Sequence, residues 1–129
     1  SHPLRHKMHL IEGSSISQKI IDQVKNFAKE YSKILLFLDS NHTHQHVLAE
    51  LNAYSDLVSI NSYCVVFDTL IENLGEKNYF NERPWDVGNN PMTALDEWLP
   101  NNPKFAVDEE FDNKLLISVS PRGFLKRIS

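Results

Sequence analysis

Two unbroken apolar runs, each followed directly by an aspartate, constrain this chain most strongly. Residues 34–38 read Ile-Leu-Leu-Phe-Leu and stop at Asp39, and residues 63–67 read Tyr-Cys-Val-Val-Phe and stop at Asp68. Runs without polar alternation are typical of parallel strands that are covered on both faces. The two runs therefore predict neighbouring core strands, each with a carboxylate at its carboxyl end.

Helical patterns separate these predicted strands. Apolar residues recur at helical spacing over residues 20–31 and again over residues 47–54. A shorter apolar run at residues 8–12 predicts a further strand, and Ser15 or Ser17 can cap the helix after it. This alternation predicts an α/β fold with a parallel sheet and helices on both faces. Ligand sites in such sheets form outside the carboxyl ends of the strands.

The remaining residues complete one domain. Residues 70–89 form a long polar connection, and Asn90-Pro91 is a good start for a short helix. Residues 105–107 and 115–119 are predicted as two more strands, which the acidic segment 108–112 joins.

Charge and chain composition exclude two classes of partner. The chain has 13 Lys+Arg against 17 Asp+Glu and shows no concentrated basic face, so a nucleic-acid partner is not expected. Its longest apolar runs are far shorter than the ~20 residues that cross a bilayer, so no membrane span is expected. A single cysteine, Cys64, cannot form an internal disulfide and favours a reducing, cytoplasmic compartment.

Glycine is scarce and scattered. The four glycines are Gly13, Gly75, Gly88 and Gly123, and no two lie within ten residues of each other. Walker loops and G-x-G-x-x-G turns need closely spaced glycines so that backbone N–H groups can approach phosphate. These residues therefore contain neither motif.

Carboxylates and histidines are the first candidates for chemistry. Asp39 and Asp68 could share a hard cation such as Mg²⁺ through oxygen ligands, or each could cap the turn that follows it. His42, His44 and His46 suggest a metal, but a helix that begins near residue 43 would turn His44 away from the other two. A single functional His42 beside Asp39 is the preferred interpretation.

The long connection holds a second set of candidates. Tyr79, Arg83 and Trp85 could line a substrate pocket, where Arg83 would pair with a carboxylate or phosphate. Alternatively, Trp85 only pins the connection to the body of the domain.

Four groups of residues, in order along essentially the whole chain, closely resemble the cephalosporin hydroxylase family. They are residues 10–15, residues 38–42 with 46–51, residues 83–85 with 88–91, and residues 114–116 with 123–127. Despite its name, that family has the fold of S-adenosylmethionine-dependent methyltransferases and includes sugar O-methyltransferases. The resemblance implies a Rossmann-like class I methyltransferase sheet that lacks its first strands and their glycine-rich loop. Residues 1–129 would then be the carboxyl-terminal part of a single methyltransferase domain.

The resemblance also implies roles for individual residues. Gly13, Ser14 and Ser15 match the turn that lines the adenine edge of the cofactor, and Asp39 and Asp68 match metal-ligand positions. His42 falls where related cation-dependent enzymes place a lysine near the reacting hydroxyl, so it is the candidate general base.

One position departs from the family pattern. The residue directly before the second aspartate is Phe67, whereas the family's first described member has an acid there. This departure removes one oxygen ligand from the expected Mg²⁺ site.

The sequence therefore predicts part of an O-methyltransferase that uses S-adenosylmethionine, with Mg²⁺ assistance, on a hydroxyl of a sugar or secondary metabolite. Two alternatives remain: a degenerate, non-catalytic module that acts through protein contacts, and a literal β-lactam hydroxylase. An incomplete sheet would expose an edge, so self-association is expected. The isolated chain is expected to be inactive.

Overall fold

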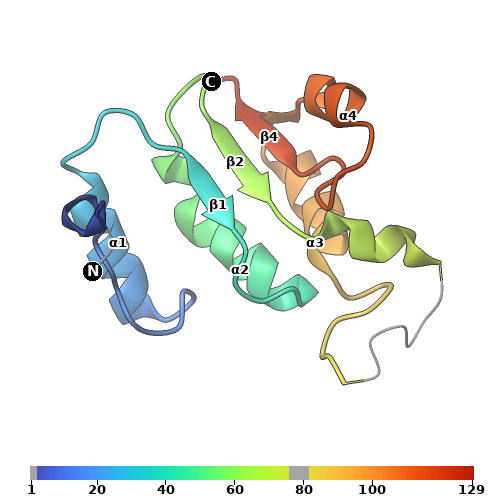
Figure 1. Cartoon of the computed structure of the whole chain (residues 1–129), viewed down its shortest axis with the longest axis horizontal. Helices are drawn as coiled ribbons and strands as arrows, with labels where there is room; N and C mark the ends of the chain where they lie inside the picture. The colour runs from blue at the N-terminus through green and yellow to red at the C-terminus, as the bar shows by residue number, and fades with distance from the viewer. Residues whose placement is uncertain (1–2, 76–81) are drawn as a thin grey trace.

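Asp39 and Asp68 follow two parallel strands. These strands form one side of a four-stranded mixed sheet (Figure 1). The computed structural model describes residues 3–75 and 82–129. Its strands are β1 (Leu36–Leu38), β2 (Tyr63–Val66), β3 (Phe105–Val107) and β4 (Phe124–Arg127), and its α-helices are α1 (Gln18–Ala28), α2 (His44–Tyr54), α3 (Pro91–Trp98) and α4 (Glu109–Leu115). Short 3-10 helices cover Arg5–Lys7, Ser55–Leu57, Thr69–Leu74 and Leu99–Asn101.

The sheet has the strand order β1-β2-β4-β3. β1 and β2 are parallel, as predicted, but β4 is antiparallel to both of its neighbours, so the prediction of a parallel sheet holds for β1 and β2 while the sheet as a whole is mixed. Gly123 explains how β4 enters beside β2. A Cβ atom on this residue would lie 2.2 Å from the carbonyl oxygen of Val66, so only glycine allows so close an approach.

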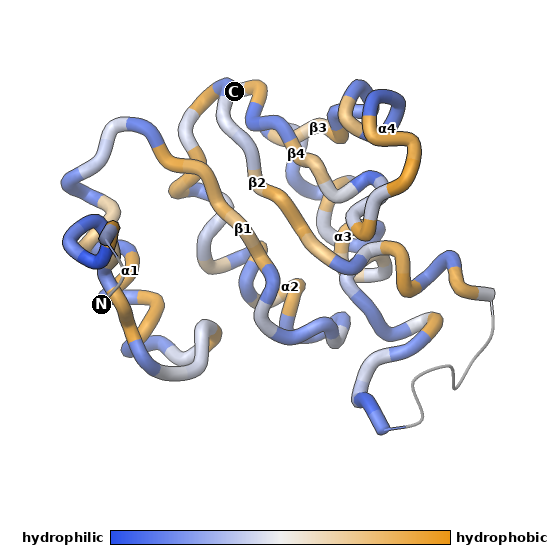
Figure 2. The backbone as a smooth tube through the Cα atoms, in the orientation of Figure 1, coloured by the Kyte–Doolittle hydropathy of each residue, from blue (hydrophilic) through white to orange (hydrophobic). Residues whose placement is uncertain are grey.

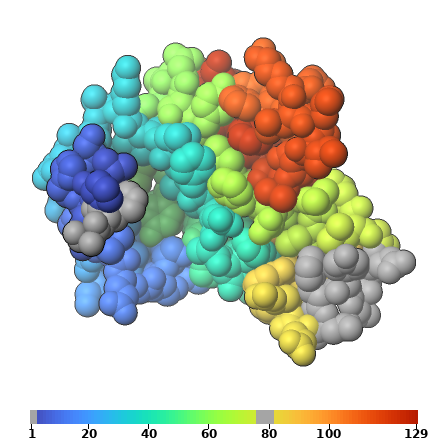
Figure 3. Space-filling model, viewed as in Figure 1, coloured from blue at the N-terminus to red at the C-terminus, as the bar shows by residue number. Residues whose placement is uncertain are grey.

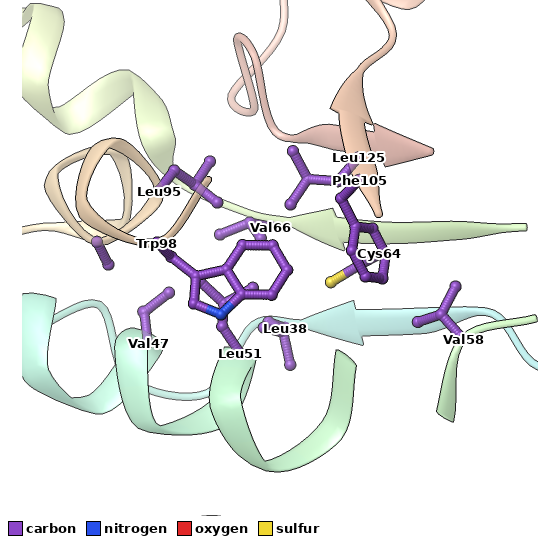
Figure 4. Close-up of a cluster of buried hydrophobic side chains, with 11 residues drawn as sticks. Leu38, Val47, Leu51, Val58, Cys64, Val66, Leu95, Trp98, Phe105 and Leu125 are labelled. Atoms are coloured by element: carbon purple, nitrogen blue, oxygen red, sulfur yellow. The ribbon is translucent and has the colours of Figure 1, made fainter. Parts of the chain in front are cut away.

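The main core lies between the sheet and helices α2 and α3. Leu38, Val66 and Leu125 point from three strands toward Leu51 of α2 and Trp98 of α3 (Figure 4). All five side chains are buried. Figure 2 shows the same pattern along the chain, because hydrophobic residues lie along β1 and β2.

The opposite face of the sheet is covered at one end only. Phe111 of α4 stacks on Phe124 of β4, with ring centroids 4.7 Å apart, and meets Tyr63 of β2 edge-on. Helices therefore lie on both faces, as predicted. At the other end, Leu35 is 50% exposed and Phe37 is 57% exposed, so the prediction that this strand is covered on both faces is wrong for the described residues. β1 is also an outer strand of the sheet, and self-association through it stays a prediction.

Two predicted strands are absent. Residues 8–12 form no strand, because no strand of the described chain pairs with them; His9 instead stacks on Phe27 of α1. Residues 109–115 form helix α4, and residues 116–119, whose apolar side chains are exposed, form no strand either. The side chain of Asp108 accepts a hydrogen bond from the N–H of Glu110 and so begins this helix. Acidic residues in its first turn suit the helix dipole.

Candidate functional site

The carboxyl ends of β1 and β2 bring Asp39, His42 and Asp68 into one cluster. Each residue offers one ligand atom, and these three atoms lie within 4.8 Å of one another. Nε2 of His42 is 3.0 Å from Oδ2 of Asp68. The His42 side chain is 16% exposed and the Asp68 side chain 37% exposed, so the pair is sheltered but open to a ligand.

Local backbone structure fixes this cluster. Asn41 accepts hydrogen bonds from the N–H and the hydroxyl of Thr43, and Thr43 is the N-cap residue directly before α2. This turn holds His42 just ahead of the helix. Asp68 adopts a left-handed backbone conformation (φ 56°) at the end of β2. Asp68 makes no side-chain capping bond to the 3-10 helix after it, and the N-cap of α2 is Thr43 rather than Asp39, so neither aspartate caps the helix that follows it.

Trp85 and Arg83 share a pocket with His42 and Asp68, which we call the His42 pocket. Its volume is about 500 Å³, and Leu70, Ile71 and Leu74 form its apolar wall. The indole of Trp85 meets the imidazole of His42 edge-on, with centroids 4.8 Å apart. The guanidinium of Arg83 lies 5.2 Å from the indole centroid. Figure 3 shows the segment after residue 81 lying against the residues around 40. Tyr79, the third candidate of this connection, lies outside the described residues.

The three histidines of residues 42–46 face three different sets of partners. Nδ1 of His44 is 2.8 Å from the hydroxyl of Thr93, and its Nε2 is 3.0 Å from Glu97. His46 instead contacts two serine hydroxyls and Glu50. This arrangement agrees with the expectation that the three imidazoles do not readily hold one metal ion.

Gly13 and Ser15 line a second cavity, beside β1, which we call the Glu50 pocket. Its volume is about 410 Å³, and Asp39, Ser40 and Glu50 also line it. Gly13 has a φ of 146°, and a Cβ there would lie 2.7 Å from Ile20, so this turn requires glycine. Ser14 does not line the pocket; it is exposed, and its carbonyl accepts hydrogen bonds from Ser17. Ser40 lines both pockets, so they adjoin beside Asp39.

Ser15 does not cap α1. Its hydroxyl donates to Oε1 of Glu50 over 2.6 Å, and α1 begins after Ser17, whose side chain makes no capping bond to the helix. Of the two predicted caps, Ser15 is therefore wrong, whereas Ser17 is the residue directly before the helix. The hydroxyl of Ser15 donates to the buried carboxylate of Glu50 on α2 instead of capping α1.

Sequence reasoning missed Glu50 and Ser40. Glu50 is 3% exposed and lies on the same buried stripe of α2 as Val47, Leu51 and Tyr54. A carboxylate at an apolar position of a helical repeat was the signal that could have found it.

Cys64 lines neither the His42 pocket nor the Glu50 pocket. Burial, followed by the nearby charge of Glu50, raises the pKa of its thiol to about 12. The thiol therefore stays protonated and unreactive, as its place in a buried strand predicts.

The residues of the cluster fit a divalent cation. Two carboxylates and one imidazole are the donor set that Mn²⁺ and similar ions accept, and the carboxylates alone suit Mg²⁺. Phe67, at the position of the missing acid, instead packs against Phe37, with ring centroids 5.9 Å apart. The site therefore offers fewer oxygen ligands than the family pattern implies.

Fold and site together define an α/β protein with a polar site at the carboxyl ends of its parallel strands. The family described as Rhamnosyl O-methyltransferase/CmcI matches residues 1–128, and the chain belongs to this family. It is the cephalosporin hydroxylase family that the motifs resemble, so that prediction is confirmed.

Among individual relatives, the rhamnosyl O-methyltransferases of Mycobacterium tuberculosis and Mycobacterium bovis are 34% identical to the chain over 118 residues. The aligned region covers 91% of this chain and 46% of each relative. The Mycobacterium leprae protein of the same name is 28% identical, with 49% of its length covered. The chain thus spans about half the length of these relatives. No solved structure matches it significantly. Within the described residues, no helix has the length and apolar character that a membrane crossing requires.

Proposed function

We propose that the protein containing this chain transfers the methyl group of S-adenosylmethionine to a hydroxyl of a sugar. The observation that carries the proposal is the position of His42, which lies beside Asp68 and Trp85 in one pocket. The relatives named as rhamnosyl O-methyltransferases support a sugar as the acceptor. In that pocket, Trp85 offers an apolar surface and Arg83 offers hydrogen-bond donors.

His42 is the proposed general base. Its Nε2 faces Asp68, which leaves Nδ1 to accept the proton of the acceptor hydroxyl. As the proton moves to Nδ1, the hydroxyl oxygen forms a bond to the methyl carbon, and the carbon–sulfur bond breaks. The products are a methyl ether and S-adenosylhomocysteine. The carboxylate of Asp68 stabilises the imidazolium that results.

The other residues of the site act by positioning. Methyl transfer is an in-line displacement, so alignment of acceptor and donor supplies much of the rate. A divalent cation at Asp39 and Asp68 would orient the acceptor oxygen and lower its pKa. Gly13 and Ser15 in the Glu50 pocket would hold the adenosine part of the donor, with the turn at Ser14 beside them.

We also propose that residues 1–129 form the carboxyl-terminal part of a larger Rossmann-like methyltransferase domain. Two observations support this: β1 is an outer strand of the described sheet, and the relatives are about twice as long as the aligned region. The codons upstream of Ser1 test it, because they should encode a strand followed by a glycine-rich turn.

Neither alternative function gains support from the site. Hydroxylation of a β-lactam would suit a metal held by two histidines and one carboxylate. The described cluster instead pairs one histidine with two carboxylates, and His46 belongs to a separate network with Glu50. No contact described above favours a non-catalytic module.

Calorimetry tests the proposal. The protein, expressed at the full length that its gene encodes, is expected to bind S-adenosylmethionine and S-adenosylhomocysteine, and Mg²⁺ is expected to tighten acceptor binding. Absence of binding to both compounds, with and without Mg²⁺, would rule out the proposed function.

A further inference from the structure

Glu50 lies outside the His42 pocket but contacts both of the loops that form the site. Its Oε1 accepts a hydrogen bond from the hydroxyl of Ser15 over 2.6 Å and another from the hydroxyl of Ser40 over 2.7 Å. Ser15 belongs to the turn after residues 8–12, and Ser40 directly follows Asp39. One buried oxygen therefore joins the turn proposed to hold the donor to the loop that carries the first metal ligand.

His46 completes this arrangement. Its Nε2 is 3.0 Å from the Ser15 hydroxyl, 3.2 Å from the Ser40 hydroxyl and 3.5 Å from Oε1 of Glu50. His46 and Glu50 are one turn apart on α2, so the helix presents them together. The four side chains form a network that spans about 35 residues of sequence, from residue 15 to residue 50.

The second oxygen of Glu50 has a different environment. Oε2 is buried and has no hydrogen-bond partner among the residues that the structure describes. A buried carboxylate oxygen without a donor is costly, and an apolar side chain would fill the same helix position without that cost. Glu50 also lines the cavity of about 410 Å³ between β1 and the turn at Gly13. A ligand in this cavity would therefore lie beside the Glu50 carboxylate.

We infer that Glu50 is a positioning residue that couples the two halves of the site. Oε1 holds Ser15 and Ser40 at a fixed separation, and Oε2 accepts a hydrogen bond from an N–H or O–H group of the adenosine bound beside it. This inference rests on the proposed function. Binding of the donor would then order the loop of Asp39, so donor and metal bind cooperatively.

The test measures this cooperativity with S-adenosylhomocysteine and Mn²⁺ as probes, on the protein at its full encoded length. In the wild type, saturating Mn²⁺ is expected to lower the Kd for S-adenosylhomocysteine several-fold. In Glu50→Gln, Oε2 or Oε1 becomes an amide donor. The Kd should then rise roughly tenfold or more, as expected for loss of a hydrogen bond to a charged acceptor. Saturating Mn²⁺ should no longer change the Kd of this variant for S-adenosylhomocysteine.

Glu97→Gln is the matched control. Glu97 also pairs with a histidine, His44, over 3.0 Å, but its side chain is 60% exposed and it lines neither the His42 pocket nor the Glu50 pocket. This variant should keep the wild-type Kd and the wild-type response to Mn²⁺. Misfolding of part of a sample lowers the binding stoichiometry without changing the Kd, so calorimetry separates the two effects.

Each outcome is decisive. An unchanged response to Mn²⁺ in Glu50→Gln overturns the inference and leaves the proposed function intact. Absence of S-adenosylhomocysteine binding in the wild type overturns the proposed function and this inference with it. If Glu50→Gln does not fold, Ser40→Ala decides, because it removes one donor to Oε1 and should reduce the response to Mn²⁺; an unreduced response contradicts the coupling.

Discussion

Nε2 of His42 lies 3.0 Å from Oδ2 of Asp68, and the indole of Trp85 meets the same imidazole edge-on. The ring is therefore oriented from two sides, by a carboxylate at the end of β2 and by an aromatic residue of the long connection. This arrangement leaves one ring nitrogen facing away from Asp68. Under the proposed function, this nitrogen accepts the proton of the acceptor hydroxyl.

Replacement of His42 tests its role as the base. His42→Gln should lower kcat for methyl transfer by roughly 10²–10⁴-fold, the usual contribution of a positioned general base. The Kd for S-adenosylhomocysteine should stay close to the wild-type value. His44→Gln is the control, because His44 contacts Thr93 and Glu97 outside the pocket, and it should retain its kcat. A His42→Gln variant with wild-type kcat would show that another group accepts the proton.

Replacement of either aspartate tests the metal site. Asp39→Asn and Asp68→Asn should each weaken Mn²⁺ binding roughly tenfold or more, because affinity for hard cations follows the charge of the ligands. Electron paramagnetic resonance of free Mn²⁺ measures this directly. Asp96→Asn is the control, since Asp96 is an exposed residue that pairs with Arg122. Equal Mn²⁺ affinity in all four proteins would place the metal elsewhere or show that none binds.

Asn90 should be the most sensitive polar residue of the fold. Its side chain is fully buried, accepts from the N–H groups of Met92 and Thr93, and donates to Glu72. Asn90→Ala removes the cap of α3 and leaves these groups unpaired, so the free energy of unfolding should fall by about 2 kcal/mol. Urea denaturation measures the loss. Asn101→Ala, at an exposed position near the end of the same helix, should change stability far less.

The contact between Tyr63 and Asp108 predicts a pH dependence of stability. The Tyr63 hydroxyl donates to Oδ2 of Asp108 over 2.7 Å, and this bond holds the pKa of Asp108 below its ordinary value while it raises the pKa of Tyr63. Because the carboxyl pKa is lowered in the folded protein, this contact adds stability at pH values above the ordinary pKa of ~3.9. That stability is lost as the pH falls through the lowered pKa. The raised tyrosine pKa adds stability that is lost as the pH rises through ~10.

Tyr63→Phe should therefore flatten the stability profile at both ends. Because both groups lie near the solvent, the difference should stay below about 1 kcal/mol. Urea unfolding at acid, neutral and alkaline pH measures it. Tyr31→Phe changes an exposed tyrosine that contacts only the Phe27 ring among the interactions described, and its profile should match the wild type. A Tyr63→Phe profile as steep as that of the wild type would contradict this assignment.

The parts of the fold that sequence predicted are those with strong local signals. The apolar runs before Asp39 and Asp68 form β1 and β2, and Asn90 caps α3 as its place before Pro91 predicts. Residues 109–119 show the opposite case. A run of Leu, Ile and Val at 115–119 resembles a strand, but the capping bond of Asp108 directs the preceding residues into a helix, and the apolar run stays exposed.

For the candidate site, sequence reasoning selected residues that the structure brings together, but it did not predict the contacts between them. Strand-end aspartates follow from the apolar pattern alone, whereas the Trp85–His42 contact joins residues far apart in the chain. The Glu50 network was missed because each of its hydroxyls has a plausible local role, such as capping by Ser15. Only the packing of α2 against the turn at Gly13 shows that these hydroxyls point to a shared carboxylate.

Transfer of an isotopic methyl group tests the central claim most directly. The protein at its full encoded length is incubated with S-adenosylmethionine labelled with ¹³C in the methyl group, Mg²⁺ and a rhamnosyl glycoside. Nuclear magnetic resonance then follows the label. We expect a labelled methyl ether on the sugar, equimolar S-adenosylhomocysteine, and loss of both in His42→Gln. If the wild-type protein binds S-adenosylmethionine yet moves no label to the hydroxyl of this or any other sugar supplied, the proposed function is contradicted.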